Sequence, residues 1–143
     1  MVKEVVHDPI LLGIPSQPAT KEDLPIAQDL LDTLVANKAS CVGMAANMIG
    51  IHKWIIAFEN DGTYMTMFNP EIIKQADPYD TEESCLSLLG GPRPYKRYKT
   101  IKVQWQNEQF QTRIKTFTGW PAQIIQHAAS TRVVSPTRPR IVE

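Results

Sequence analysis

Two residues of this sequence, Cys85 and His127, carry side chains that commonly bind transition metals. A cysteine thiolate and a neutral imidazole are both frequent ligands of zinc and iron in proteins. Each residue alone, however, is more often a buried or hydrogen-bonded structural residue than a ligand. Helices that bind a metal usually offer a second histidine four residues after the first, and that position is Thr131 here. The two residues therefore permit a metal site without establishing one.

A third segment could contact a ligand through its backbone. Residues 43–50 read GMAANMIG and are rich in small side chains. Small residues let two backbones, or a backbone and a ligand, approach closely. Tight packing of a loop against a sheet explains the same composition, and from the residues alone it is the favoured interpretation.

The elements that must position these segments are those of an α+β protein. Apolar residues between Leu24 and Val35 recur every three or four positions, which predicts an amphipathic helix of about four turns. A last helix is predicted from Trp120 onward, because Pro121 suits a first helical turn and Ile124, Ile125 and Ala128 share one face. Residues 74–84 are polar and predicted to be exposed. Strands are predicted at 54–58, 64–68, 101–105 and 110–116, joined in two hairpins. Helix, strands and helix in this order indicate an α+β fold.

Length and composition fit a single domain. The 143 residues are 43% hydrophobic, and the apolar pattern stops after residue 130, so we predict one domain over residues 1–130 and a tail over 131–143. Fifteen basic and fifteen acidic residues cancel, which gives no reason to expect nucleic-acid binding or a basic membrane surface. With two cysteines, no signal segment and no apolar run of about 20 residues, we expect a cytoplasmic protein.

The order and spacing of the three segments resemble those of peptide deformylases, whose motifs are GxGxAAxQ, EGCLS and QHExDH. Here they read VGMAANMIG, ESCLS and WPAQIIQH, supported by HDP at 7–9, FNPEI at 68–72 and FTGWPA at 117–122. The resemblance covers residues 1–127. It implies an α+β fold in which small antiparallel sheets pack around a C-terminal helix that carries the metal site.

The resemblance also implies roles for individual residues. Cys85 and His127 match metal ligands. Leu86 matches the residue whose backbone N–H helps to hold the developing oxyanion. Gly43 matches the last glycine of the first motif, beside the bound peptide, and Arg97 matches a basic residue near the substrate.

The reaction of the family is hydrolysis of the N-formyl group from the starting methionine of new proteins, so the implied partners are N-formyl-methionyl peptides. The implied cofactor is one divalent metal, Fe(II), with Zn or Ni as alternatives. Such a metal makes hydroxide available near neutral pH. A glutamate then takes and returns the proton, and an amide side chain stabilises the oxyanion.

Several positions depart from the family pattern. Met48, which the resemblance places with Gly43 and Arg97 among the substrate-binding residues, stands where the family has the oxyanion glutamine. Ser84 stands where the family has a glycine. Ala128 stands in place of the general-base glutamate, and Ser130 and Thr131 in place of the final aspartate and histidine. The sequence therefore predicts a deformylase fold with impaired turnover and a metal that is weakly bound or absent.

Two other interpretations remain open from the sequence. The chain could be a catalytically inactive relative that binds N-terminal peptides, or an interaction module that keeps only the fold. Because the apolar pattern of the last helix ends early, we also expect that exposed apolar groups could lead to self-association.

Overall fold

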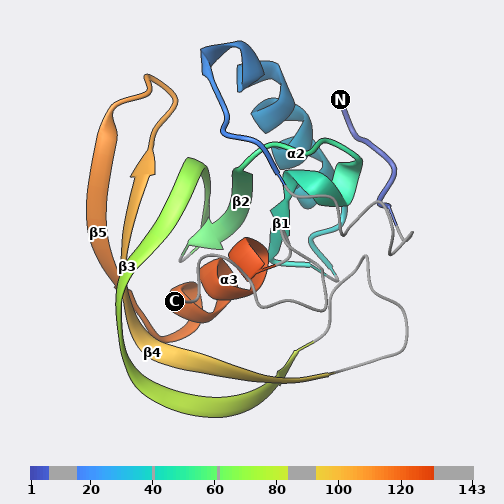
Figure 1. Cartoon of the computed structure of the whole chain (residues 1–143). Coiled ribbons are helices and arrows are strands. Elements are labelled where there is room, and N and C mark those ends of the chain that lie inside the picture. Colours follow the sequence, from blue (N-terminus) through green and yellow to red (C-terminus); the bar gives the residue numbers. More distant parts are fainter. Residues whose placement is uncertain (7–15, 40, 61, 84–92, 131–143) are drawn as a thin grey trace.

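The computed structural model describes residues 1–6, 16–39, 41–60, 62–83 and 93–130 (Figure 1), without the side chains of Glu83, Arg93, Ala129 and Ser130. Within this part of the chain, no helix is long and apolar enough to cross a membrane.

The first helix, α2, spans Leu24–Ala36 and follows a short 3-10 turn, η1 (Lys21–Asp23). The turn is closed by the Asp23 side chain, whose Oδ2 accepts the Thr20 backbone N–H at 2.8 Å. Pro25 lies in the first helical turn, where no intrahelical N–H is needed. One face of α2 is buried against the sheet through residues three and four positions apart: Ala27, Leu30, Thr33 and Leu34.

Five antiparallel strands form one sheet in the order β1-β2-β3-β4-β5. Their bounds are Gly43–Ala45, Ile55–Asn60, Thr63–Glu83, Arg93–Gln106 and Thr112–Thr118. A second 3-10 turn, η2 (Ala46–Ile49), follows β1 and ends at Gly50, whose φ of 83° is the left-handed conformation that glycine tolerates best.

The long strand β3 bends at Asn69, where the backbone takes a φ of 53°. The Asn69 side chain holds this bend: its Oδ1 accepts the Ala19 N–H at 2.7 Å, and its Nδ2 donates to Gln106 Oε1 at 2.7 Å. Before the bend β3 pairs with β2, and after it β3 pairs with β4. The sheet therefore folds over on itself and partly encloses the last helix (Figure 1).

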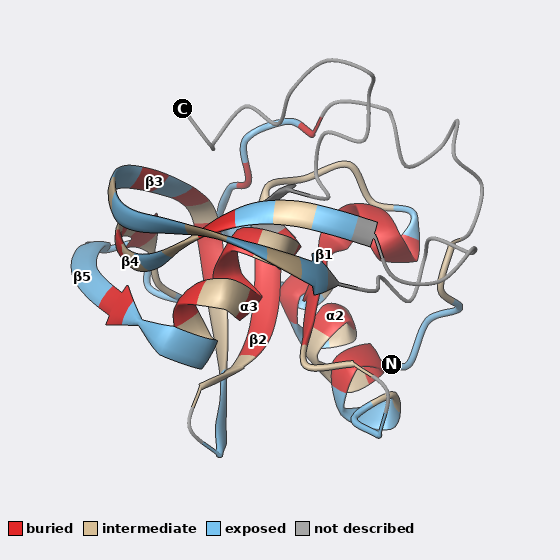
Figure 2. Cartoon of the chain, turned by 90° about the horizontal axis from the view of Figure 1, so that it is seen from below, coloured by how far each residue is buried: buried red, intermediate tan, exposed pale blue. Residues whose placement is uncertain are grey.

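The last helix, α3, spans Gly119–Ser130 and lies inside this fold of the sheet. Figure 2 shows α3 and β2 as mainly buried, while much of the outer strands is exposed. Two apolar clusters result. The α3 cluster includes Phe58, Val103, Ile125 and Ala128. The α2 cluster lies on the other side of the first strands and includes Leu30, Leu34, Met48 and Phe68.

The fold class and the two helices are confirmed, as are the buried residues Ile101, Val103 and Trp105. Strands β3 and β4 are much longer than predicted, because residues 74–83 continue β3 and pair with residues 93–102 of β4. Most of these residues are exposed or half-buried, as predicted, but they are a strand.

In the last hairpin, the side chains that face the core are not the ones that the sequence predicted. Phe110 lies in the turn with a φ of 57° and packs against Phe68 of the α2 cluster, with ring centroids 4.9 Å apart. In β5, Lys115 is opposite the buried Val103, so Lys115 faces inward and Ile114 faces outward. The alternation of Phe110, Thr112, Ile114 and Thr116 was therefore not the buried face of this strand.

Candidate active site

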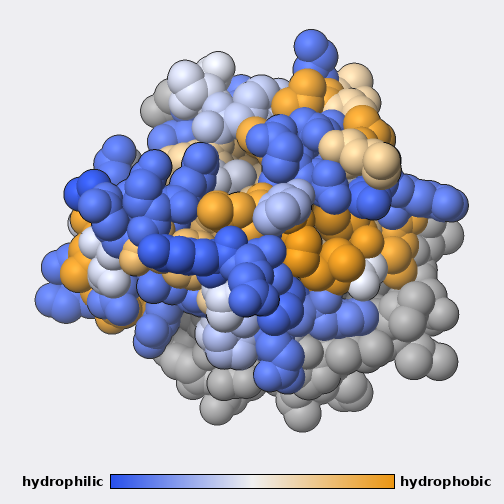
Figure 3. All heavy atoms as spheres, turned by 90° about the horizontal axis from the view of Figure 1, so that it is seen from above, coloured by the Kyte–Doolittle hydropathy of each residue, from blue (hydrophilic) through white to orange (hydrophobic). Residues whose placement is uncertain are grey.

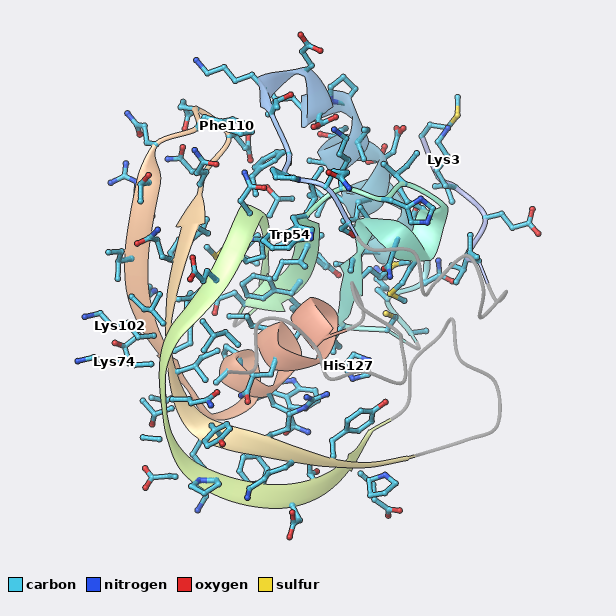
Figure 4. All side chains as sticks on the ribbon, viewed as in Figure 1. Lys3, Trp54, Lys74, Lys102, Phe110 and His127 are labelled. Atoms are coloured by element: carbon cyan, nitrogen blue, oxygen red, sulfur yellow. The ribbon has the colours of Figure 1, made fainter. Side chains whose placement is uncertain are left out.

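His127 lies in the second half of α3 and is half-buried (Figure 4). Its imidazole meets the ring of Tyr95 on β4 edge to face, with centroids 6.2 Å apart and an interplanar angle of 75°. Aromatic pairs in this geometry are mutually stabilising. The contact fixes the side of α3 from which His127 projects.

Arg97 also contacts Tyr95. Its guanidinium carbon lies 4.5 Å from the centre of the Tyr95 ring, and the residue is only 3% exposed. A cation over a tyrosine face is attracted by the ring quadrupole, and more strongly when water is excluded. The structure thus brings two of the predicted site residues, Arg97 and His127, onto the same tyrosine.

Gln126, next to His127, holds α3 against β4. Its Nε2 donates to the Tyr98 carbonyl at 2.8 Å, and its Oε1 accepts the Tyr98 N–H at 2.9 Å. Nε2 also donates to the Ala122 carbonyl one turn earlier, at 3.0 Å. The Gln126 carboxamide thus pairs with both backbone groups of Tyr98, as a neighbouring strand would. These bonds fix the distance between α3 and β4.

Gly43 is placed where β1 passes close to α3. A Cβ at this position would lie 2.7 Å from Ile124 Cγ2 and 3.5 Å from Phe58 Cβ. Real side chains do not tolerate the first distance, so the close approach of helix and strand by itself requires glycine. Ile124 is three residues before His127 on α3.

Met48 is buried, at 1% exposure, and packs in the α2 cluster. The Met48 sulfur is 3.4 Å from the Ala45 nitrogen, which donates to it. A thioether accepts hydrogen bonds only weakly and donates none. The Met48 side chain therefore lies in the α2 cluster and not in the α3 cluster, which packs around the helix that carries His127.

Ala128 follows His127 and is fully buried at 0% exposure in the α3 cluster. Its methyl group can neither accept nor return a proton. At this position of α3 the chain contributes packing and no acid–base group.

The predicted residues Ser84, Cys85, Leu86 and Thr131 lie outside the described part of the chain, so the separation of Cys85 from His127 stays untested. The described residues contain no group of three or more histidine, cysteine or acidic residues arranged to hold a metal ion.

Tyr95 and Ile124 are not recognisable from the sequence as parts of this site, and the sequence gives Gln126 no role of its own. Tyr95 lies in a polar stretch whose strand character was not predicted. Gln126 lies off the helix face of Ile124, Ile125 and Ala128 that was predicted to be apolar, so its burial at 1% exposure has no signal in that pattern.

Comparison with known proteins identifies the family of this chain. The family model described as polypeptide deformylase matches residues 4–130, which is most of the chain. The chain belongs to the peptide deformylase family. The peptide deformylase of Clostridium beijerinckii is 49% identical over 127 residues, which cover 89% of this chain and 93% of that protein. Peptide deformylase 1 of Clostridium perfringens is 33% identical over 104 residues, covering 71% of this chain and 69% of that protein.

Solved deformylase structures share the fold. The structure from Thermotoga maritima has a TM-score of 0.84 at 25% identity and covers 94% of this chain and 93% of its own. A class I type b deformylase from Acinetobacter baumannii, solved with Met-Ala-Ser bound, has a TM-score of 0.82 at 24% identity and covers 92% and 94%. These likenesses confirm the deformylase fold of this chain.

Peptide deformylases use a divalent metal, iron, and the donor set of this chain fits such an ion only in part. Of the residues that match the family's ligands, the described part of the chain includes His127 alone. The position that follows it holds the buried methyl group of Ala128. One thiolate and one imidazole would leave the ion with two protein ligands instead of three.

Proposed function

We propose that this deformylase acts on N-formyl-methionyl ends of newly made proteins, in the cytoplasm, and removes the formyl group slowly. The family match over residues 4–130 and the 49% identity to the Clostridium beijerinckii enzyme support the reaction. The slow turnover is inferred from Ala128, which follows His127 and has a fully buried methyl group in place of a proton-transferring side chain.

In this proposal the remaining site residues take the roles implied by the family motifs. Cys85 and His127 would hold the metal weakly, because they supply two protein ligands instead of three, and the Leu86 backbone N–H donates to the developing oxyanion. Gly43 lines the path of the peptide. Arg97, which lies over the same Tyr95 ring that His127 contacts, supplies the cation near the substrate.

Two losses slow the reaction. Without a carboxylate after His127, general acid–base assistance worth about 10²- to 10⁴-fold is missing. The thioether of Met48 cannot donate a hydrogen bond to the oxyanion, and loss of one such donor costs about 2.7–4 kcal/mol. We expect some peptide binding to persist, because two of the three predicted substrate-binding residues, Gly43 and Arg97, match the family pattern.

The test compares three chains: the natural protein, Ala128→Glu and Ala128→Gln. The two variants add the same bulk to the buried position, but only the glutamate can move a proton. Turnover of a formyl-methionyl peptide is measured with added Fe(II), against a metal-only control. We expect Ala128→Glu to be at least about 100-fold faster than Ala128→Gln. A natural chain as fast as Ala128→Glu would contradict the proposed impairment.

An inactive peptide-binding protein is the second candidate, because Gln126 still holds α3 in place although the general base is gone. Metal content by elemental analysis and titration with a formyl-methionyl peptide separate the two. Peptide binding without metal or turnover would favour the second candidate. Absence of peptide binding, of metal and of turnover would contradict both.

A further inference from the structure

Strand β5 is the last strand of the sheet, and its outer side is open. The strand order ends at β5, and within the described ranges no strand or loop forms a backbone hydrogen bond with it from the side away from β4. An open edge presents unpaired N–H and C=O groups that an extended peptide can pair with. A shallow groove of about 550 Å³ borders this edge and separates it from α2.

The side chains of β5 divide into two faces with different chemistry. Arg113 and Lys115 lie opposite the buried Trp105 and Val103, so both cations stand on the inner face, beside the groove. Ile114 stands between them on the outer face and is 52% exposed. All three residues border the groove. Along β5, a cation, an apolar residue and a second cation therefore follow one another at Arg113, Ile114 and Lys115.

The charge around this edge is one-sided. Strands β4 and β5 contain five and two basic residues, respectively, and neither contains an acidic residue. Arg113 donates to Gln111 Oε1 at 3.0 Å, and Lys115 lies over the Phe117 ring at 5.3 Å, so each touches a neutral group. Glu108 is the single carboxylate among the groove residues, and it lies outside both strands. Figure 3, seen from above, shows apolar side chains gathered beside α2 and hydrophilic ones on the hairpin side.

We propose that the β5 edge binds an extended acidic segment of another protein as a sixth strand. Directly opposite residues in a sheet share a face, so the complementary segment alternates acidic and apolar residues. Its acids face Arg113 and Lys115, and the apolar residue between them faces Ile114. Backbone pairing supplies affinity, and the two cations select the sequence.

Other occupants fit this edge less well. Two copies of β5 paired antiparallel about Ile114 would place Arg113 opposite Lys115, and pairing about Lys115 would oppose two lysines, which is destabilising. The last thirteen residues of the chain carry three arginines and one glutamate, so they lack the alternating acids. The cations thus guard the edge against self-pairing and favour an acidic partner.

The probe is a capped, fluorescein-labelled heptapeptide of alternating valine and glutamate, matched in length to the seven residues of β5. Its control has lysine in place of every glutamate. Anisotropy titration of the full chain should show saturable binding of the glutamate peptide, weakened by salt, and no binding of the lysine peptide. Equal binding of both peptides, or binding of neither, overturns the proposal.

Charge-reversal variants locate the site. Arg113→Glu with Lys115→Glu should weaken binding at least about fivefold. Lys74→Glu with Lys102→Glu changes the net charge equally but alters a cross-strand pair on the outer face, visible at the left in Figure 4. This second pair should bind the peptide as the natural chain does. Equal weakening in both double variants would mean a general charge effect and would overturn the proposed edge.

Backbone pairing is tested with the probe itself. The peptide is N-methylated on alternate residues in two versions, so that each version blocks one of its two edges. Only one edge of the probe can pair with β5, and we expect one version to lose binding while the other keeps it. Full binding by both versions would show that no strand is added.

Discussion

Replacing Gly43 by alanine tests whether the close approach of β1 and α3 explains this glycine. The new Cβ would lie 2.7 Å from Ile124 Cγ2, whereas carbon atoms in good contact are about 3.5–4.0 Å apart. Phe58 and Ile124 are both buried, so neither can move into solvent. Overpacking of this kind costs about 1–3 kcal/mol.

The assay is urea unfolding followed by tryptophan fluorescence, with free energies from linear extrapolation. Ile124→Ala removes the atom that meets the new Cβ and by itself should cost about 2–5 kcal/mol through the cavity that it leaves. If the steric contact is the cause, the double variant is more stable than the sum of the single effects predicts, by about 1 kcal/mol or more.

Gly62→Ala is the matched control. Gly62 has a φ of 88°, and a Cβ added there would meet no atom within 4 Å, so alanine strains the backbone without a clash. Its effect should add to that of Ile124→Ala within about 0.5 kcal/mol. Equal additivity for Gly43→Ala would refute the packing explanation and would strengthen a direct role of Gly43 beside the peptide.

Three further outcomes are expected. Gln126→Leu removes both hydrogen bonds to Tyr98 and should lower the free energy of unfolding by about 2–4 kcal/mol, measured in urea. A loss below about 1 kcal/mol would show that these two hydrogen bonds are dispensable for stability. Asn69→Gly keeps the left-handed bend but loses the side-chain hydrogen bonds to Ala19 and Gln106. It should be less destabilising than Asn69→Ala, which loses these bonds and also strains the bend; the reverse order of thermal midpoints would contradict this reasoning. The N-terminal ammonium holds the pKa of Asp32 below its usual range. The pairing of these two groups therefore stabilises the fold at pH values above the unfolded pKa of Asp32, and this stabilisation is lost as pH falls through the folded pKa. An NMR titration that gives Asp32 an ordinary pKa would refute this pairing.

The sequence predicted the parts of the fold whose pattern is local. Helix α2 was predictable because its apolar residues repeat with the helical period, and the core of β4 because Ile101, Val103 and Trp105 alternate. Phe110 was assigned to a strand because its partner, Phe68, is distant in sequence and cannot be recognised from local periodicity. The extension of β3 was missed because residues that pair across long strands need not alternate in hydrophobicity.

For the site, the motifs predicted which residues take part but not which other residues contact and position them. The resemblance identified His127 and Arg97, yet only the folded chain shows that both contact the ring of Tyr95. Gly43 could be interpreted from sequence as a packing residue or a peptide contact, and its distance to Ile124 supplies the packing reason. These relations are tertiary, because they join residues of β1, β4 and α3 that are far apart along the chain.

The bend of β3 at Asn69 has a consequence for how the protein opens. A single continuous strand belongs to both halves of the folded sheet, so neither half can detach without breaking the hydrogen-bond ladder that it shares with the other. We therefore expect the two halves to form one cooperative unit, with amide protons of β2 and β4 exchanging through the same global opening. A chain cut at the bend would expose two fresh strand ends and would be prone to aggregate rather than to fold as separate halves.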